Sequence, residues 1–175
     1  GYFIFLFMSS QLNWSIIKRF ASRNMHGFTL QDVAGEFPDK NRNYLAKVMA
    51  KMVGLGVLCK ISRNIYHIIP LNADPQTYAP DEYQVAKYMM HNKEYYIGYG
   101  SAMKIHGLTF QPSTKEYVVT RKQMKPAIKS TNGISFQFIK HDATRFFGFD
   151  HFWINKREQA MVSDLEKTIV DAASK

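Results

Sequence analysis

Cysteine is nearly absent from this sequence: Cys59 is the single one among 175 residues. An intrachain disulfide and a cysteine-based zinc site are therefore excluded, and such cysteine usage is typical of a reducing compartment. Long apolar runs are also missing, since no stretch approaches the roughly 18–20 residues that a membrane span needs. From these absences we expect a cytoplasmic protein that does not cross a membrane.

Familiar catalytic motifs are absent as well. The sequence has no Gly-x-x-x-x-Gly-Lys-Ser/Thr, Gly-x-Gly-x-x-Gly, Gly-x-Ser-x-Gly or His-Glu-x-x-His segment. We therefore expect that the protein is not an enzyme and that it binds neither a cofactor nor a metal. One grouping leaves an alternative open, because a hairpin could bring two imidazoles and two carboxylates together to hold a divalent metal, as in a metal-dependent nuclease. Its members are His141, Asp142, Asp150 and His151.

The first segment, 1–8, is apolar but short. It carries no basic flank and no small-residue cleavage site, so it fits a signal peptide poorly. We expect an apolar extension translated upstream of a start at Met8, or alternatively a strand that docks on the body of the protein.

The region 9–72 predicts three helices followed by a β-hairpin. Apolar residues recur at helical spacing over about 12–22, 29–37 and 41–53, and Thr29 with Asp32 is a capping-box variant for the second helix. Two β-rich runs, 54–61 and 65–69, flank a short polar turn. This order is typical of a winged helix-turn-helix domain, which binds DNA.

The region 80–175 predicts a small mixed α+β domain, joined to the first by a linker over 71–80 that contains two prolines. The fold class expected for the whole chain is thus α+β. Helices are expected over 81–91 and 101–106, and strands over 116–120, 134–139, 145–149 and 152–154. A last helix is expected after Ser163 as N-cap, with Glu166 in the capping-box position and an apolar stripe of Leu165, Ile169, Val170 and Ala173.

Acidic residues are scarce relative to basic ones. Lysine and arginine number 23 against 14 acids, which gives a formal charge of +9 and favours a polyanionic partner such as nucleic acid. From 40 to 67 the sequence has no acid at all, whereas ordinary surfaces mix both signs. The candidate DNA-binding residues are Lys40, Arg42, Asn43, Tyr44, Lys47, Lys51, Lys60 and Arg63. The alternatives are a solvated helix face, or a winged-helix module that meets an acidic protein partner. A second basic stretch, 115–145, could extend a DNA footprint.

Three segments carry a resemblance to a known family. The run from Tyr96 to Thr109 resembles the Tyr-x-x-x-x-Ser-Ala-Leu-x-x-His-Gly-Leu-Thr segment of AbiEi-type antitoxins, which are the antitoxin and transcriptional regulator of type IV toxin–antitoxin (abortive infection) systems. Arg145-Phe146-Phe147-Gly148 and the run from Val162 to Asp171 match in the same order. We interpret His106 as a residue that closes a helix, not as a catalytic group.

The resemblance implies a bacterial regulator that represses its own operon by binding double-stranded promoter DNA. It also implies that a neighbouring nucleotidyltransferase-like toxin is counteracted without a stable complex. The family pattern continues beyond Lys175, so the C-terminal domain is expected to be incomplete here. Because winged-helix proteins usually bind as pairs, we expect an inverted-repeat site and a monomer or weak dimer that pairs on DNA.

Overall fold

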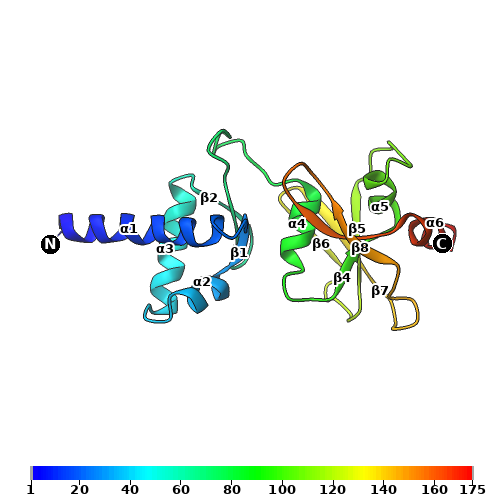
Figure 1. Ribbon diagram of the computed structural model, residues 1–175, viewed down its shortest axis with the longest axis horizontal. Helices are drawn as coiled ribbons and strands as arrows, with labels where there is room; N and C mark the ends of the chain where they lie inside the picture. The colour runs from blue at the N-terminus through cyan, green and yellow to red at the C-terminus, as the bar shows by residue number, and fades with distance from the viewer. Residues whose placement is uncertain (1, 175) are drawn as a thin grey trace. The chain divides into compact units, whose positions relative to one another are not determined.

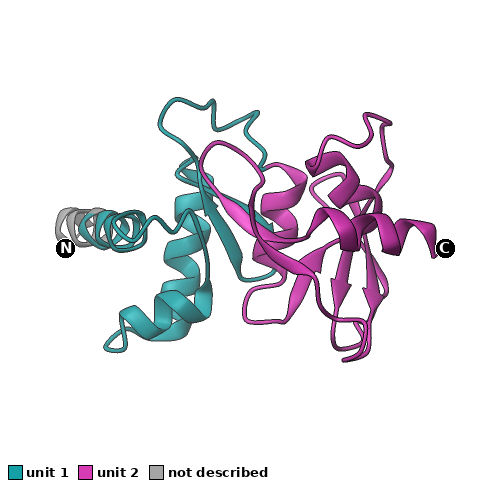
Figure 2. Cartoon of the chain, turned by 45° about the vertical axis from the view of Figure 1, so that its right-hand side comes forward, with its two compact units in different colours: residues 1–80 teal, residues 81–175 magenta. Residues whose placement is uncertain are grey.

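The structure is a computed structural model that describes residues 2–174, with side chains described from residue 11 onward. It is of the α+β class, with helices and two separate β-sheets. The chain divides into two compact units, Gly1–Pro80 and Asp81–Lys175 (Figure 2). In the described part of the chain, no helix combines the length and the apolar character that crossing a membrane requires.

Unit 1 combines helices with a small antiparallel sheet whose strand order is β1-β3-β2. Figure 1 shows the helices of unit 1 beside this sheet. Phe20 and Phe28 stack at 4.2 Å between ring centroids, in a core to which both the helices and the sheet contribute. Gly27 pairs with His67, so the first strand lies beside the hairpin. The elements are α1 (Tyr2–Ala21), β1 (Gly27–Thr29), α2 (Leu30–Glu36), α3 (Arg42–Gly54), β2 (Leu58–Ser62) and β3 (Ile65–Ile68).

Local signals determine where the helices of unit 1 begin. The hydroxyl of Thr29 accepts from the backbone N–H of Asp32 at 3.1 Å, and the Asp32 carboxylate accepts from the N–H of Thr29 at 2.7 Å. This confirms the predicted capping box. Asn41 caps α3 in the same way, because its side chain accepts from the N–H of Asn43 at 2.8 Å.

Unit 1 differs from its expected elements at three points. The helix expected from about 12 begins at Tyr2, so the strand alternative for the apolar segment is wrong over 2–8, and Gly1 lies outside the described residues. The strand Gly27–Thr29 was not expected, because three residues are too few to show an alternating pattern. The hairpin also starts later than expected, at Leu58, after a turn in which Gly56 has a φ of +70°.

Unit 2 contains a sheet with the strand order β6-β7-β5-β4-β9-β8. The pairs β5–β7 and β4–β9 are parallel, and the remaining neighbours are antiparallel. Helices α5 and α6 pack against each other, and α4 packs against β9. The elements are α4 (Glu82–Met89), β4 (Tyr95–Ile97), α5 (Tyr99–Ile105), β5 (Lys115–Thr120), β6 (Ile128–Thr131), β7 (Ile134–Lys140), β8 (Phe149–Trp153), β9 (Gln159–Ser163) and α6 (Leu165–Ala173).

The strands near the end of unit 2 differ from the expected ones. Instead of strands over 145–149 and 152–154, one strand, β8, covers Phe149–Trp153. The strands β4, β6 and β9 were not expected. Of these, β6 and β7 are joined by Asn132 and Gly133, both with positive φ, which is the usual chemistry of a two-residue hairpin turn.

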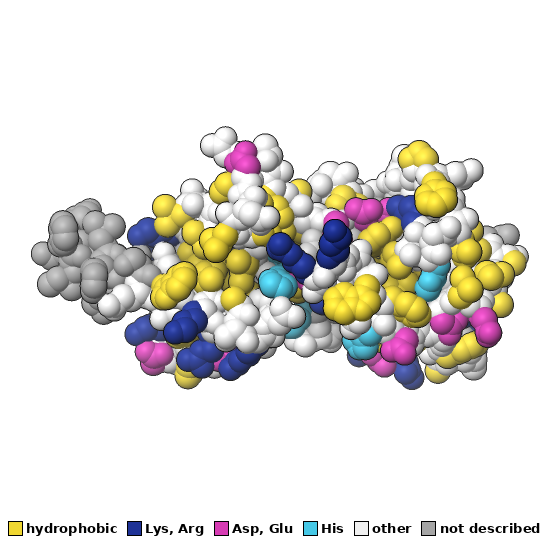
Figure 3. Space-filling model, turned by 45° about the horizontal axis from the view of Figure 1, so that its top comes forward, with side chains coloured by type: hydrophobic (Ala, Val, Ile, Leu, Met, Phe, Trp, Pro, Cys, Tyr) yellow, Lys and Arg dark blue, Asp and Glu magenta, His cyan; other side chains and the backbone are white. Residues whose placement is uncertain are grey.

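Helix α6 departs most from its expectation. Its N-cap is Asp164 rather than Ser163, and the Asp164 carboxylate accepts from the N–H of Lys167 at 2.7 Å. Leu165, Ile169 and Val170 are exposed by 47%, 53% and 61%, so the apolar stripe faces outward. The buried side of the helix is polar. Figure 3 shows apolar side chains on the surface at the α6 end of unit 2.

Candidate functional site

Helix α3 presents opposite faces of different character. The side chains Leu45, Val48, Met49 and Met52 are buried in the core of unit 1, as their spacing predicts. Asn43, Lys47 and Lys51 lie across the helix from them and are exposed. Arg42 is exposed in the first turn. Figure 3 shows Lys and Arg side chains gathered over the helical part of unit 1.

Tyr44 and Lys40 differ from the other candidate residues. Tyr44 is half-buried and packs against the core of unit 1, so it sits at the edge of the exposed face. Lys40 lies in the turn before α3, where its ammonium pairs with the Asp39 carboxylate at 2.9 Å. That hydrogen bond raises the pKa of Lys40 and lowers that of Asp39. The nearby carboxylate offsets part of the positive charge of Lys40.

Four other basic residues of this region have no carboxylate partner in the part of the chain that the structure describes. They are Arg42, Lys47, Lys60 and Arg63. Lys60 lies on β2 and Arg63 in the β2–β3 turn, and both side chains are exposed. We call the exposed side chains of Arg42, Asn43, Lys47, Lys51, Lys60 and Arg63 the basic surface of unit 1.

Two arginines at the end of α1, Arg19 in its last turn and Arg23 in the turn that follows, are compensated by one carboxylate. Arg19 and Arg23 contact the carboxylate of Glu36 at 3.1 and 2.5 Å, which connects the last turn of α1 to the end of α2. Hydrogen bonding from Arg23 lowers the pKa of Glu36. Carboxylate contacts therefore neutralise positive charge where α1 and α2 meet, whereas among the described residues no carboxylate forms an ion pair with Arg42, Lys47, Lys60 or Arg63.

The structure does not assemble the candidate metal site. His141 uses both ring nitrogens in contacts with tyrosine hydroxyls, and the Asp142 carboxylate accepts from the backbone N–H groups of Thr144 and Arg145. Asp150 and His151 are exposed on β8. Among residues 11–174, no three His, Cys, Asp or Glu side chains are placed to hold a metal ion.

A buried polar centre lies in unit 2, formed by Tyr96, Tyr99, His141, Lys167 and Asp171. The imidazole of His141 bridges the two phenols, with Nδ1 2.9 Å from the Tyr96 oxygen and Nε2 2.8 Å from the Tyr99 oxygen. Asp171 accepts from the Tyr96 hydroxyl at 3.3 Å and from the Lys167 ammonium at 2.9 Å. The centre connects β4 and α5 to α6.

Burial sets the protonation states in this centre. It raises the pKa values of Tyr96 and Tyr99 and lowers that of His141. Both phenols are therefore protonated and the imidazole is neutral near pH 7. Because Tyr96 donates its one proton to Asp171, Nδ1 of His141 is assigned as the donor to the Tyr96 oxygen, and Nε2 accepts from Tyr99. These hydrogen bonds hold β4, α5 and α6 together.

The segments that carry the family resemblance meet around this centre. The His106 ring contacts the carbonyl of Ser163 at 2.7 Å, so the end of α5 is held against the end of β9. The N–H of Asp164 donates to the carbonyl of Gly148 at 2.8 Å. The Lys167 ammonium lies 4.6 Å above the ring of Phe147. His106 thus has a structural contact at a helix end, as its position next to Gly107 indicates.

The sequence interpretation missed Lys167 and Asp171 as buried partners. Their spacing of four residues on a helix, with opposite charges, was the available signal. A search against protein-family models and a comparison with curated proteins both gave no match. The assignment of function therefore depends on the geometry of unit 1 and on the sequence.

Proposed function

We propose that the chain is a DNA-binding transcriptional regulator and that unit 1 is its winged helix-turn-helix domain. In this proposal α2 and α3 are the helix-turn-helix pair, α3 is the recognition helix and the β2–β3 hairpin is the wing. The observation that carries the proposal is the basic surface of unit 1, which has exposed cations on α3 and the hairpin and no acidic residue from 40 to 67.

Four side chains of this surface have proposed roles that suit their chemistry. Lys47 and Lys51 bind phosphates as point charges, while the amide of Asn43 can pair with an adenine edge in the major groove. Arg63, in the hairpin turn, contacts the backbone or the minor groove beside it. Tyr44 supports the helix from its half-buried position.

We further propose that the regulator is an antitoxin of the AbiEi type. The support is the sequence resemblance in the segments from Tyr96 to Thr109, Arg145 to Gly148 and Val162 to Asp171. In this role the chain binds an inverted repeat in its own promoter as a pair and represses the operon. It counteracts a nucleotidyltransferase-like toxin without forming a stable complex with it. The proposal assigns it no enzymatic activity.

The DNA-binding proposal is tested by a salt titration. Fluorescence anisotropy with a labelled duplex gives the association constant from low to moderate salt, for the wild type and for K47A/K51A. Each lost phosphate contact flattens the slope of log K against log salt by about 0.9, so the variant should lose about 1.8 from its slope. The matched control is K156A/R157A, which removes the same charge from exposed basic residues of unit 2 outside the stretch 115–145. An unchanged slope in K47A/K51A would contradict the assignment of α3.

Sequence preference is tested separately with Asn43. In N43A, discrimination at one base pair of the selected site should fall by about 1–3 kcal/mol, because an amide-to-adenine contact is lost. The salt slope should stay the same, since asparagine releases no counterion. Selection of binding sites from a random duplex pool measures the preference. If N43A and the wild type enrich the same sequences from this pool, Asn43 does not contact a base.

A further inference from the structure

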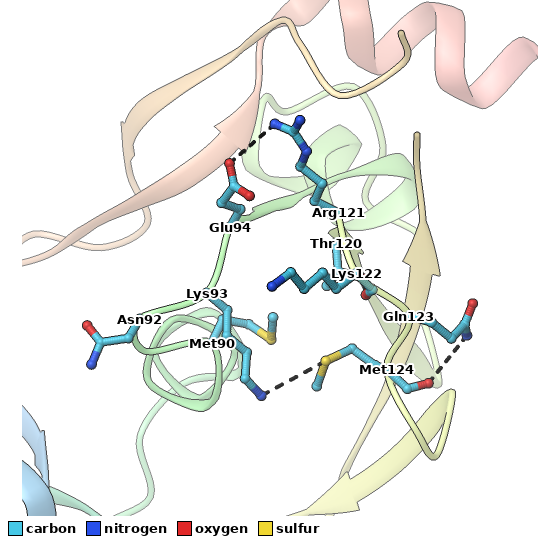
Figure 4. Close-up of a pocket in the computed structure, with 9 residues that line it drawn as sticks. All are labelled: Met90, Asn92, Lys93, Glu94, Thr120, Arg121, Lys122, Gln123 and Met124. Atoms are coloured by element: carbon cyan, nitrogen blue, oxygen red, sulfur yellow. Dashed lines mark hydrogen bonds and ion pairs between the residues drawn. The ribbon is translucent and has the colours of Figure 1, made fainter. Parts of the chain in front are cut away.

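A cavity of about 450 Å³ lies in unit 2, on the surface between the end of α4 and the end of β5. This volume is within the range of small-molecule sites, which is about 300–1,000 Å³. Met90, Asn92, Lys93 and Glu94 line one side, and the segment from Thr120 to Met124 lines the other (Figure 4). None of these residues belongs to the basic surface of unit 1 or to the buried polar centre.

Both walls of the cavity are built on fixed backbone. The N–H of Lys93 donates to the carbonyl of Met90 at 2.9 Å, which closes the turn after α4. Thr120 is paired with Tyr95 and with Lys140 in neighbouring strands, and its hydroxyl donates to the carbonyl of Lys122 at 2.9 Å. The cavity is therefore largely preformed and would need little rearrangement to accept a ligand.

The charges around the cavity leave an excess of positive groups. The single carboxylate of the lining, Glu94, pairs with Arg121 at 3.5 Å. The ammonium groups of Lys93 and Lys122 remain, and both side chains project into the space between the walls (Figure 4). Within the described residues, no carboxylate pairs with either of them.

Lys93 makes a contact that an anion would improve. Its ammonium reaches the thioether of Met124, with Nζ and Sδ 4.0 Å apart. Thioether sulfur is a weak acceptor, whereas an N⁺–H to phosphate-oxygen bond is about twice as strong as a neutral hydrogen bond. A phosphate between Lys93 and Lys122 would replace this weak contact by charge-assisted ones.

The floor of the cavity has a different chemistry. Met124 is half-buried and its thioether offers an apolar, polarizable surface, while Met90, which is 1% exposed, closes the cavity toward the core. Sulfur next to an aromatic ring is a favourable contact. Cations beside a thioether floor suit a ligand that combines an anionic group with a flat ring.

We propose that this cavity binds a nucleotide, with its phosphate between Lys93 and Lys122 and its base against the thioether of Met124. The nucleotide is a free mononucleotide or one unit of a nucleic-acid strand, and the chemistry recognised is the same in both cases. The site is independent of the DNA contacts proposed for α3.

Isothermal titration calorimetry of the full chain with AMP, adenosine and inorganic phosphate tests the proposal. AMP should bind at least about 10-fold more tightly than adenosine or phosphate, because each of these lacks one half of the ligand. K93M/K122M should weaken AMP about 10-fold or more, while the matched control K129M/K156M stays within about twofold of the wild type. M124S should weaken AMP and leave the affinity for phosphate unchanged.

A second arm identifies the source of the nucleotide. This arm compares single-stranded oligo(dA) with AMP in a K47A/K51A background. If oligo(dA) binds more tightly than AMP, and K93M/K122M removes this difference, the ligand is one unit of a nucleic-acid strand. If AMP binds more tightly than oligo(dA), the ligand is a free nucleotide. The proposal is overturned if AMP gives no heat, if K93M/K122M binds AMP like the wild type, or if phosphate binds as tightly as AMP. Far-UV circular dichroism shows whether each variant is folded, and folding is expected because both lysines are exposed.

Discussion

Replacing Asp171 by asparagine should strongly destabilise unit 2, because the substitution leaves the buried Lys167 ammonium without its carboxylate. The side chains of Lys167 and Asp171 are 5% and 1% exposed, and their charged atoms are 2.9 Å apart. Removing one partner of such a pair costs about 3–5 kcal/mol, since the other charge stays buried and uncompensated. We therefore expect D171N to lower the free energy of unfolding of unit 2 by about this amount.

Replacing the other partner, in K167M, should lower the free energy of unfolding of unit 2 by less than D171N does. Asp171 would keep the hydroxyl of Tyr96 at 3.3 Å and the half-exposed guanidinium of Arg145 at 4.0 Å. In D171N, by contrast, the remaining charge of Lys167 faces the ring of Phe147 and the positive charge of Arg145. The double variant K167M/D171N has no buried charge from this pair, so the second substitution should restore part of the stability lost in D171N.

Urea unfolding followed by the fluorescence of Trp153 measures these effects in unit 2. The chain has two tryptophans, and a W14F background removes the one in unit 1, so the signal reports on unit 2 alone. This separation matters because chains with more than one unit need not unfold in a single transition. A loss below about 1 kcal/mol in D171N, or a double variant less stable than D171N, would refute the reasoning.

Three further changes have predicted outcomes. Gly148→Ala should lower the stability of unit 2 by about 1–3 kcal/mol in urea unfolding, because φ is +72° and the added Cβ would lie 3.0 Å from the Cβ of Lys167. The control is Gly35→Ala, which should not lower stability because nothing lies within 4 Å of its added Cβ. Burial lowers the pKa of His141 in the folded state, so the unfolded chain binds a proton at this residue at a higher pH than the folded chain does. The contribution of neutral His141 to the free energy of unfolding is therefore complete above about pH 6.5 and falls as the pH drops below it. In H141Q the free energy of unfolding should depend less on pH between pH 7 and 5. Thr29→Ala should lower the stability of unit 1 by about 1 kcal/mol in thermal unfolding. An unchanged stability in this variant would contradict the role of the capping box.

Much of unit 1 could be predicted from its sequence because its signals are local. Thr29 with Asp32, and Asn41 before α3, specify helix starts within three residues. The buried stripe of α3 repeats with helical spacing, so its exposed face could be predicted with it. The strand Gly27–Thr29 could not, because it is defined by its pairing with β3, about forty residues later.

The interior of unit 2 could not be predicted in the same way. Helical periodicity assumes that apolar residues face inward, and α6 reverses this. Its buried Asp171 accepts from Tyr96, and its buried Lys167 pairs with Asp171 and lies over the ring of Phe147, so two of these partners are distant in sequence. The strands β4 and β9 are short and have no alternating pattern. The turn at Asn132-Gly133, in contrast, was a readable hairpin signal between β6 and β7.

The place of β4 in its sheet has a consequence for how the chain folds during synthesis. This strand lies between β5 and β9, and its Tyr96 contacts Asp171, so the core of unit 2 closes only when residues near the end of α6 have been made. Unit 1 pairs residues within 2–80 and can fold while unit 2 is still being translated. A ribosome stalled between β7 and β9 would thus carry a folded unit 1 followed by a sheet without β9, in which the edge of β4 is unpaired and open to aggregation.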